Sequence, residues 1–121
     1  MLINLKTILS GKEKQAVGSF NIYSYETIKG VCKAVEKTKM PAIISFGASY
    51  LKNMSLETVK YITEEASKDL PADVALHLDH CKDIEIIKAA IEAGFTSVMY
   101  DGSALPFEEN VKNSRAVANM A

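Results

Sequence analysis

Apolar and polar residues follow two recurring patterns along this chain, and the two patterns alternate. Short apolar runs bounded by glycine, proline or polar residues predict buried strands, while apolar residues three or four positions apart predict helices that bury one face. The predicted strands are 17–22, 42–46, 74–78 and 96–100. The predicted helices are 3–10, 24–39, 56–70, 84–93 and a last one that starts at Pro106.

Helix ends are marked by residues with specific capping roles. Ser24 and Ser55 stand where a helix N-cap belongs, because a serine hydroxyl accepts a hydrogen bond from a free backbone N–H of the first turn. Gly94 is placed to end the fourth helix in a left-handed conformation. Gly11 and the charged loop of residues 12–14 are expected to end the first helix.

The spacing of the predicted strands indicates the fold class. They begin near residues 17, 42, 74 and 97, which is a period of roughly 25 to 30 residues, as expected for βαβ crossovers. We therefore predict an α/β fold forming the N-terminal half, about four βα units, of a TIM (β/α)8 barrel, with 1–121 as a single partial domain truncated on its C-terminal side. An open doubly wound sheet is the alternative. The sequence has neither a GxGxxG motif after the first strand nor a Walker A motif, which excludes the two commonest nucleotide-binding forms of that fold.

Composition narrows the classes of partner. With a net charge of -1, the chain lacks the excess of basic residues that binding to nucleic acid or an anionic membrane requires. Its 48% content of hydrophobic residues is that of an ordinary globular protein. No stretch approaches the roughly 20 apolar residues of a membrane span. Two cysteines without CxxC spacing favour a reducing compartment, so we predict a cytoplasmic protein.

The third predicted strand ends in residues that can bind metal or move protons. His80 follows Asp79, and in parallel α/β folds chemistry collects at this end of the strands. The alternatives are a structural histidine and a helix-capping or turn aspartate. His77 points to the same side as Asp79, and its aliphatic neighbours favour a hydrogen-bonded core histidine. Cys81 faces away from His80 in an extended strand, so we do not expect it to be a ligand.

Two further strands end in small or polar residues. Gly47–Ser49 could let backbone amides approach a ligand oxygen, and an ordinary tight turn is the alternative. Asp101 could hold a second cation or cap the following helix. A catalytic zinc site takes three protein ligands plus an open position, whereas this chain has two histidines, both on one strand. These residues alone therefore do not complete a usual zinc site.

Taken together, these stretches resemble the class II (zinc-dependent) fructose-bisphosphate aldolase family, which includes the tagatose-bisphosphate aldolases. The resemblance follows the chain in order and covers the N-terminal half of the family's barrel. The matching stretches are 19–22, 41–44, 74–80, 93–103 and 105–111.

The resemblance implies a role for five residues. His80 matches a ligand of the catalytic zinc, and Asp79 matches the acid/base that handles the substrate hydroxyl proton. Asn21 and Ser49 match positions near the bound sugar phosphate. Asp101 matches a site associated with a second divalent or monovalent cation in some members.

The implied activity is reversible cleavage of fructose 1,6-bisphosphate to dihydroxyacetone phosphate and glyceraldehyde 3-phosphate, in a homo-oligomer. A tagatose-bisphosphate-specific aldolase is one alternative, and a catalytically silent half barrel that self-associates is another. The chain departs from the family at Cys81, where many members have glycine, and at Ala104, where many have histidine.

Overall fold

A four-stranded parallel sheet forms the centre of the molecule. The computed structural model describes residues 1–10 and 15–121, so the predicted helix stop at Gly11 and the loop of residues 12–14 lie outside the described residues. The strands stand in chain order across the sheet, and all pair in parallel. They are β1 (Gly18–Asn21), β2 (Ala42–Gly47), β3 (Val74–Cys81) and β4 (Ser97–Tyr100).

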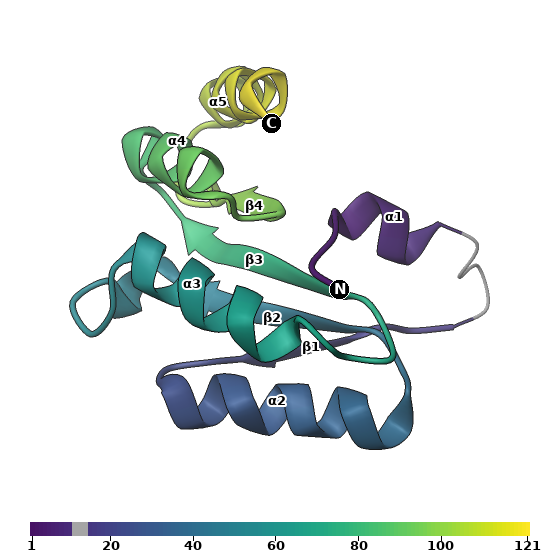
Figure 1. Cartoon of the computed structure of the whole chain (residues 1–121). Helices are drawn as coiled ribbons and strands as arrows, with labels where there is room; N and C mark the ends of the chain where they lie inside the picture. The colour runs from purple at the N-terminus through teal and green to yellow at the C-terminus, as the bar shows by residue number, and fades with distance from the viewer. Residues whose placement is uncertain (11–14) are drawn as a thin grey trace.

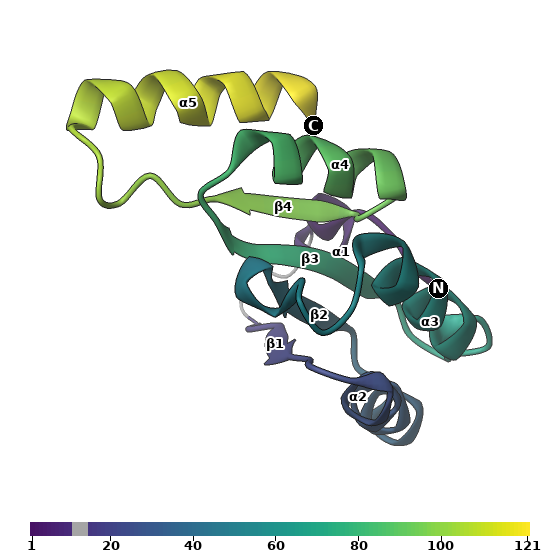
Figure 2. The ribbon, with the colours of Figure 1, turned by 90° about the vertical axis from the view of Figure 1, so that its left-hand side faces the viewer.

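A helix follows each strand, which confirms the four predicted βα units. Helices α2, α3 and α4 lie along one face of the sheet, and α5 continues beyond α4 (Figure 1; Figure 2). Sequence and structure differ at the ends of elements by a few residues, and the largest differences are at β3, which extends to Cys81, and at α3, which ends at Ser67. The helices are α1 (Leu5–Leu9), α2 (Tyr25–Thr38), the short 3₁₀ helix η1 (Ala48–Tyr50), α3 (Leu56–Ser67), α4 (Ile84–Ala93) and α5 (Phe107–Met120).

The predicted caps are present. The hydroxyl oxygen of Ser24 accepts a hydrogen bond from the Thr27 backbone N–H at 3.4 Å, and that of Ser55 accepts one from Thr58 N–H at 3.2 Å. Gly94 ends α4 with φ 95°, a left-handed conformation that glycine adopts without a steric cost. These contacts fix where the helices begin and end relative to the strands.

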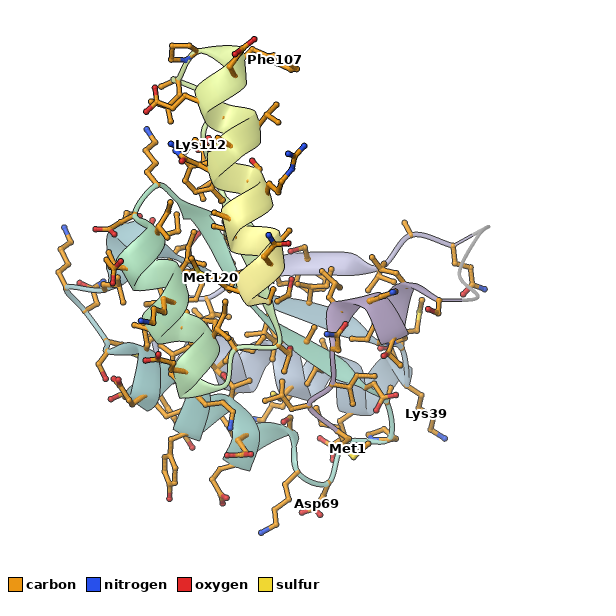
Figure 3. The ribbon with its side chains drawn as sticks, turned by 90° about the horizontal axis from the view of Figure 1, so that it is seen from above. Met1, Lys39, Asp69, Phe107, Lys112 and Met120 are labelled. Atoms are coloured by element: carbon orange, nitrogen blue, oxygen red, sulfur yellow. The ribbon has the colours of Figure 1, made fainter. Side chains whose placement is uncertain are left out.

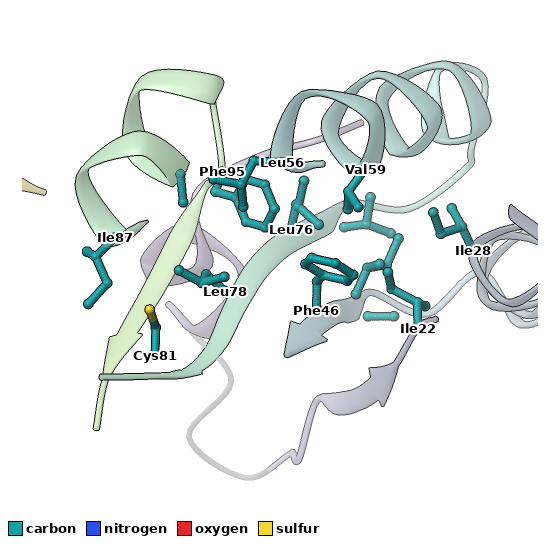
Figure 4. Packing of buried hydrophobic residues seen from close by; sticks show 14 of the residues in the cluster. Ile22, Ile28, Phe46, Leu56, Val59, Leu76, Leu78, Cys81, Ile87 and Phe95 are labelled. Carbon is teal, nitrogen blue, oxygen red and sulfur yellow. The ribbon is translucent and has the colours of Figure 1, made fainter. Parts of the chain in front are cut away.

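The core lies between the sheet and its helices. Alternate residues of β2 and β3, among them Ile44, Phe46, Leu76 and Leu78, are fully buried by the helices, because side chains along a strand point to opposite faces. Figure 4 shows Phe46, Leu76 and Leu78 on the side of the sheet that the helices cover. The helices supply Ile28, Val59 and Ile87, each also fully buried.

The margins of the sheet are more open than its centre. All four residues of β1 are exposed, including Phe20 with 49% of its surface accessible, whereas β2 and β3 are mostly buried. The N-terminal residues Met1–Ile3 run beside the start of β3, where Val74 N–H donates to the Met1 carbonyl at 2.9 Å. This pairing was not predicted, because it joins segments more than 70 positions apart.

Helix α5 projects from the body of the molecule. Seen from above, it runs from Phe107 at the far end back toward Met120 over the sheet (Figure 3). Phe107 is 81% exposed, and Val117 is the residue of α5 that is buried. Most of this helix is therefore unsupported by the described core.

Candidate functional site

The carboxyl ends of the four strands surround one cavity of ≈ 270 Å³. All five residues predicted for the site line it. They are Asn21 at the end of β1, Ser49 in η1, Asp79 and His80 in β3, and Asp101 directly after β4. The parallel register places these ends at the same edge of the sheet, which is why residues far apart in sequence converge there.

A bulge near the end of β3 directs His80. Pairing between β3 and β4 shifts register between Leu78 and Cys81, and His80 has φ 49°, a left-handed conformation that is uncommon outside glycine. The His80 side chain is 64% exposed, whereas Cys81 is buried with its thiol donating to the Asp83 carbonyl at 3.3 Å. His80 is exposed and Cys81 is buried, and the prediction that they face different sides is therefore met. The strand is bulged at this point, however, and does not have the regular alternation on which the prediction was based.

His80 is held by Asp101. Its Nδ1 lies 3.1 Å from Oδ2 of Asp101, and Oδ1 of that carboxylate accepts hydrogen bonds from the Ser103 backbone N–H and hydroxyl at 3.1 and 2.6 Å. The hydrogen bond to Asp101 raises the pKa of His80, and the donors from Ser103 and His80 hold the pKa of Asp101 far below its usual value. A ring that donates from Nδ1 keeps Nε2 available for a cation.

Asp79 lies beside both imidazole rings. Its Oδ1 is 3.8 Å from Nε2 of His77 and 3.9 Å from Nε2 of His80. The carboxylate side chain is 25% exposed, so it faces the cavity while much of it is covered by protein. A partly buried carboxylate at this position can accept and return a proton.

His77 is a hydrogen-bonded, largely buried histidine, as predicted. Its Nδ1 lies 2.8 Å from the Ser97 hydroxyl oxygen on β4. Burial lowers the pKa of His77, an effect that the nearby Asp79 carboxylate opposes. The ring is therefore neutral near pH 7, and its partner on β4 fixes its orientation.

The cavity also contains residues that were not predicted from sequence. Tyr50 and Lys82 line it, and the Tyr50 ring packs edge-on against Tyr23 with centroids 4.7 Å apart. Lysine is common on exposed surfaces, so the residue type alone does not predict that Lys82 belongs to the site. Its position could have predicted this, because Lys82 follows His80 by two residues at the end of a strand.

The described residues do not by themselves form a metal site. Residues 1–10 and 15–121 hold no group of three His, Cys, Asp or Glu side chains arranged to bind a metal ion. His80 fits the role of one ligand, and both Asp101 oxygens already accept hydrogen bonds. Within that same part of the chain, no helix is long and apolar enough to cross a membrane.

Comparisons with known proteins agree with this arrangement. Residues 4–121 match the family model described as fructose-bisphosphate aldolase class-II. The chain is 43% identical over 121 residues to the sulfofructosephosphate aldolase of Alkalicoccus urumqiensis, covering 98% of this chain and 42% of that protein. It is 39% identical over 128 residues to the fructose-bisphosphate aldolase of Mycoplasma pneumoniae, covering 100% of this chain and 43% of the relative.

The crystal structure of the YdjI aldolase from Escherichia coli K12 has the same fold over the matched region. It superposes with a TM-score of 0.89 at 32% identity, covering 98% of this chain and 47% of that one. The α/β arrangement described above therefore matches part of an aldolase barrel, and the chain spans less than half the length of these relatives. On the strength of the family match and the shared fold, this chain belongs to the class II fructose-bisphosphate aldolase family.

Proposed function

We propose that this chain supplies the acid/base and one metal ligand of a ketose-bisphosphate aldolase site. The observation that carries the proposal is the single cavity lined by Asn21, Ser49, Asp79, His80 and Asp101. The reaction is reversible cleavage of fructose 1,6-bisphosphate to dihydroxyacetone phosphate and glyceraldehyde 3-phosphate. The similar proteins named for fructose-bisphosphate and sulfofructosephosphate support a phosphorylated ketose as substrate.

The proton transfer belongs to Asp79. In the cleavage direction its carboxylate takes the proton of the substrate hydroxyl next to the breaking carbon–carbon bond. The new carbonyl forms from that alkoxide carbon, and the bonding electron pair leaves with the other fragment. The same carboxyl group returns the proton in the condensation direction.

His80 and Asp101 prepare the site for zinc, on which the class II family depends. When bound, zinc supplies Lewis-acid polarisation of the substrate carbonyl. Asp101 accepts from Nδ1 of His80 and so leaves Nε2 for the metal, an arrangement typical of histidine ligands. Among the described residues His80 is the one zinc ligand that we propose, and a second cation at Asp101 is part of the same proposal.

The other cavity residues bind the substrate. Lys82 brings a positive charge to the cavity, which suits the phosphate group of a phosphorylated sugar. Asn21 and Ser49 offer an amide and a hydroxyl for the hydroxyl groups of the substrate or for its phosphate. Fructose and tagatose 1,6-bisphosphate differ in configuration at one carbon, and both are candidates for this site.

The test is cleavage by the complete protein that contains this chain. Triose phosphate release from fructose 1,6-bisphosphate, tagatose 1,6-bisphosphate and sulfofructose phosphate would be followed by a coupled assay, before and after exhaustive chelation. We expect cleavage of at least one substrate, its loss on chelation and its recovery on adding zinc. Cleavage of none of the three, or full activity after chelation, would refute the proposal.

A second candidate is a self-associating half barrel without activity. The exposed residues of the edge strand β1, Phe20 among them, favour it, because an open strand edge with apolar side chains invites pairing with another chain. Light scattering on the isolated 121-residue chain distinguishes the two. A cooperatively folded monomer at high concentration would eliminate this candidate, and dimers or larger assemblies would support it.

A further inference from the structure

His77 lies between two serines in the sheet. The register places Ser45 of β2 on one side of it and Ser97 of β4 on the other. The ring is hydrogen-bonded to Ser97, whose hydroxyl oxygen is 2.8 Å from Nδ1. In the described part of the chain no hydrogen bond joins the ring to Ser45, although Ser45 is buried in the sheet.

The surroundings of the ring select one tautomer. Nε2 of His77 faces Oδ1 of Asp79 at 3.8 Å, and an ionised carboxylate can only accept. A neutral imidazole carries one N–H, so the hydrogen belongs on Nε2 and Nδ1 carries the lone pair. Ser97 must then donate its hydroxyl hydrogen to Nδ1 at 2.8 Å, while the Nε2–H lies on the side of the Asp79 carboxylate, at a distance of 3.8 Å that is longer than a hydrogen bond.

We propose that His77 is a positioning residue for Asp79, and that the Ser97 hydroxyl sets the tautomer that lets it act. The inference rests on the acid/base role proposed for Asp79. Both imidazoles approach the carboxylate at Oδ1, at 3.8 and 3.9 Å. This leaves Oδ2 as the oxygen that receives the substrate proton. His77 itself touches neither substrate nor metal in this scheme.

The tautomer can be measured without substrate, zinc or turnover. Nitrogen-15 NMR separates a protonated from an unprotonated ring nitrogen, and this chain has only two histidines, so the His80→Ala variant assigns both sets of signals. We expect His77 to give the signature of a single Nε2–H tautomer. Solid-state NMR provides the same reading if the chain forms assemblies. A predominantly Nδ1–H ring would overturn the proposal.

Matched serine variants test the cause. Ser97→Ala should remove the donor to Nδ1 and shift both ring nitrogens toward values averaged over two tautomers, and Ser97→Thr should restore the single tautomer. Ser45→Ala, which alters the other flanking serine, should leave the tautomer unchanged. Equal effects of Ser97→Ala and Ser45→Ala would show a general packing response and overturn the assignment to Ser97.

Activity then tests the positioning role. In the complete enzyme, Ser97→Ala should lower kcat by roughly 10- to 100-fold, as expected for partners that orient a functional group, with little change in KM and with recovery in Ser97→Thr. Suppose that the wild-type protein has the Nε2–H tautomer but Ser97→Ala leaves kcat unchanged. That result would overturn the positioning role of His77. If the wild-type enzyme cleaves no ketose phosphate, the proposed function is wrong. The NMR measurement still tests the tautomer of His77 independently, because it needs no substrate.

Discussion

The imidazole Nδ1 of His80 lies 3.1 Å from Oδ2 of Asp101, although 21 positions separate the two residues. The contact is set by the sheet, because the Asp101 backbone N–H donates to the Cys81 carbonyl at 2.8 Å and brings the ends of β3 and β4 together. The side chain of one strand thus orients that of its neighbour. The protonation of His80 therefore depends on a residue of the next βα unit.

The first prediction concerns that protonation in metal-free protein. The hydrogen bond to Asp101 is the main cause of the raised pKa of His80, so Asp101→Asn should lower this pKa toward 6.5. An NMR titration of the two histidines measures it. Asp83→Asn, which removes a helix-capping carboxylate, is the control and should leave the His80 pKa unchanged. An unaltered His80 pKa in Asp101→Asn would contradict the prediction.

The same pair predicts how stability changes with pH. Because the pKa of His80 is raised on folding, its contribution is complete below about 6.5, the ordinary histidine value, and is lost as pH rises through the folded value. The pKa of Asp101 is lowered, so its contribution is present above its ordinary value of 3.8 and is lost in acid. Urea unfolding across pH should show the His80 change weakened and the Asp101 change absent in Asp101→Asn.

Asp79→Asn tests the acid/base assignment. Asparagine has nearly the same shape but cannot accept the proton, so kcat of the complete enzyme should fall roughly 10²- to 10⁴-fold. The thermal midpoint should change little, because Asp79 is partly exposed and lies near the end of the strand. Asp69→Asn, at the groove between α2 and α3, is the matched control. A fully active Asp79→Asn enzyme would reject the assignment.

Phe46→Ala tests the core. Phe46 is fully buried between β2 and the helices, and removal of such a side chain leaves a cavity that costs about 3–5 kcal/mol of unfolding free energy. Urea denaturation measures the loss. Tyr61→Ala removes another aromatic side chain from a position that is 67% exposed, and should stay within about 0.5 kcal/mol of wild type. Similar losses at both positions would contradict the described packing.

Two glycines should respond to alanine in opposite directions. Gly94 has φ 95°, so Gly94→Ala should cost about 1–2 kcal/mol. Its new Cβ would also lie 3.0 Å from Lys60 Cε, a flexible side chain that can move. Gly30 lies inside α2 with open space where the added methyl group would lie, so Gly30→Ala should stabilise by about 0.5–1 kcal/mol. Thermal unfolding of the pair gives the two signs directly.

Local patterns were sufficient to predict the order and type of the strands and α-helices, but not the 3₁₀ helix η1. Helical spacing, the Ser24 and Ser55 caps and the Gly94 stop each act within a few residues, so they are visible in sequence. Asp79, His80, Ser49 and Asp101 could be predicted because they stand at or just after the ends of apolar runs, whereas Asn21 was indicated only by the family resemblance. Their family resemblance added roles to Asp79 and His80 that strand position alone could not assign.

Contacts that depend on tertiary register were not predictable in the same way. The pairing of Met1–Ile3 with Val74 and the hydrogen bond between His77 and Ser97 join separate segments. The extension of β3 to Cys81 depends on a bulge, and the local sequence of β3 contains no glycine to mark it. Such features follow from how β3 and β4 align, which a pattern of apolar residues does not specify.

The left-handed backbone at His80 does not suit a histidine, although the metal-binding role proposed for this position requires one. A glycine or asparagine would accept φ 49° more readily, and a non-glycine residue there costs about 1–2 kcal/mol. Variants selected only for thermal stability should therefore lose the histidine. A trade-off of this kind is typical of positions retained for their side chain rather than for their fit to the backbone.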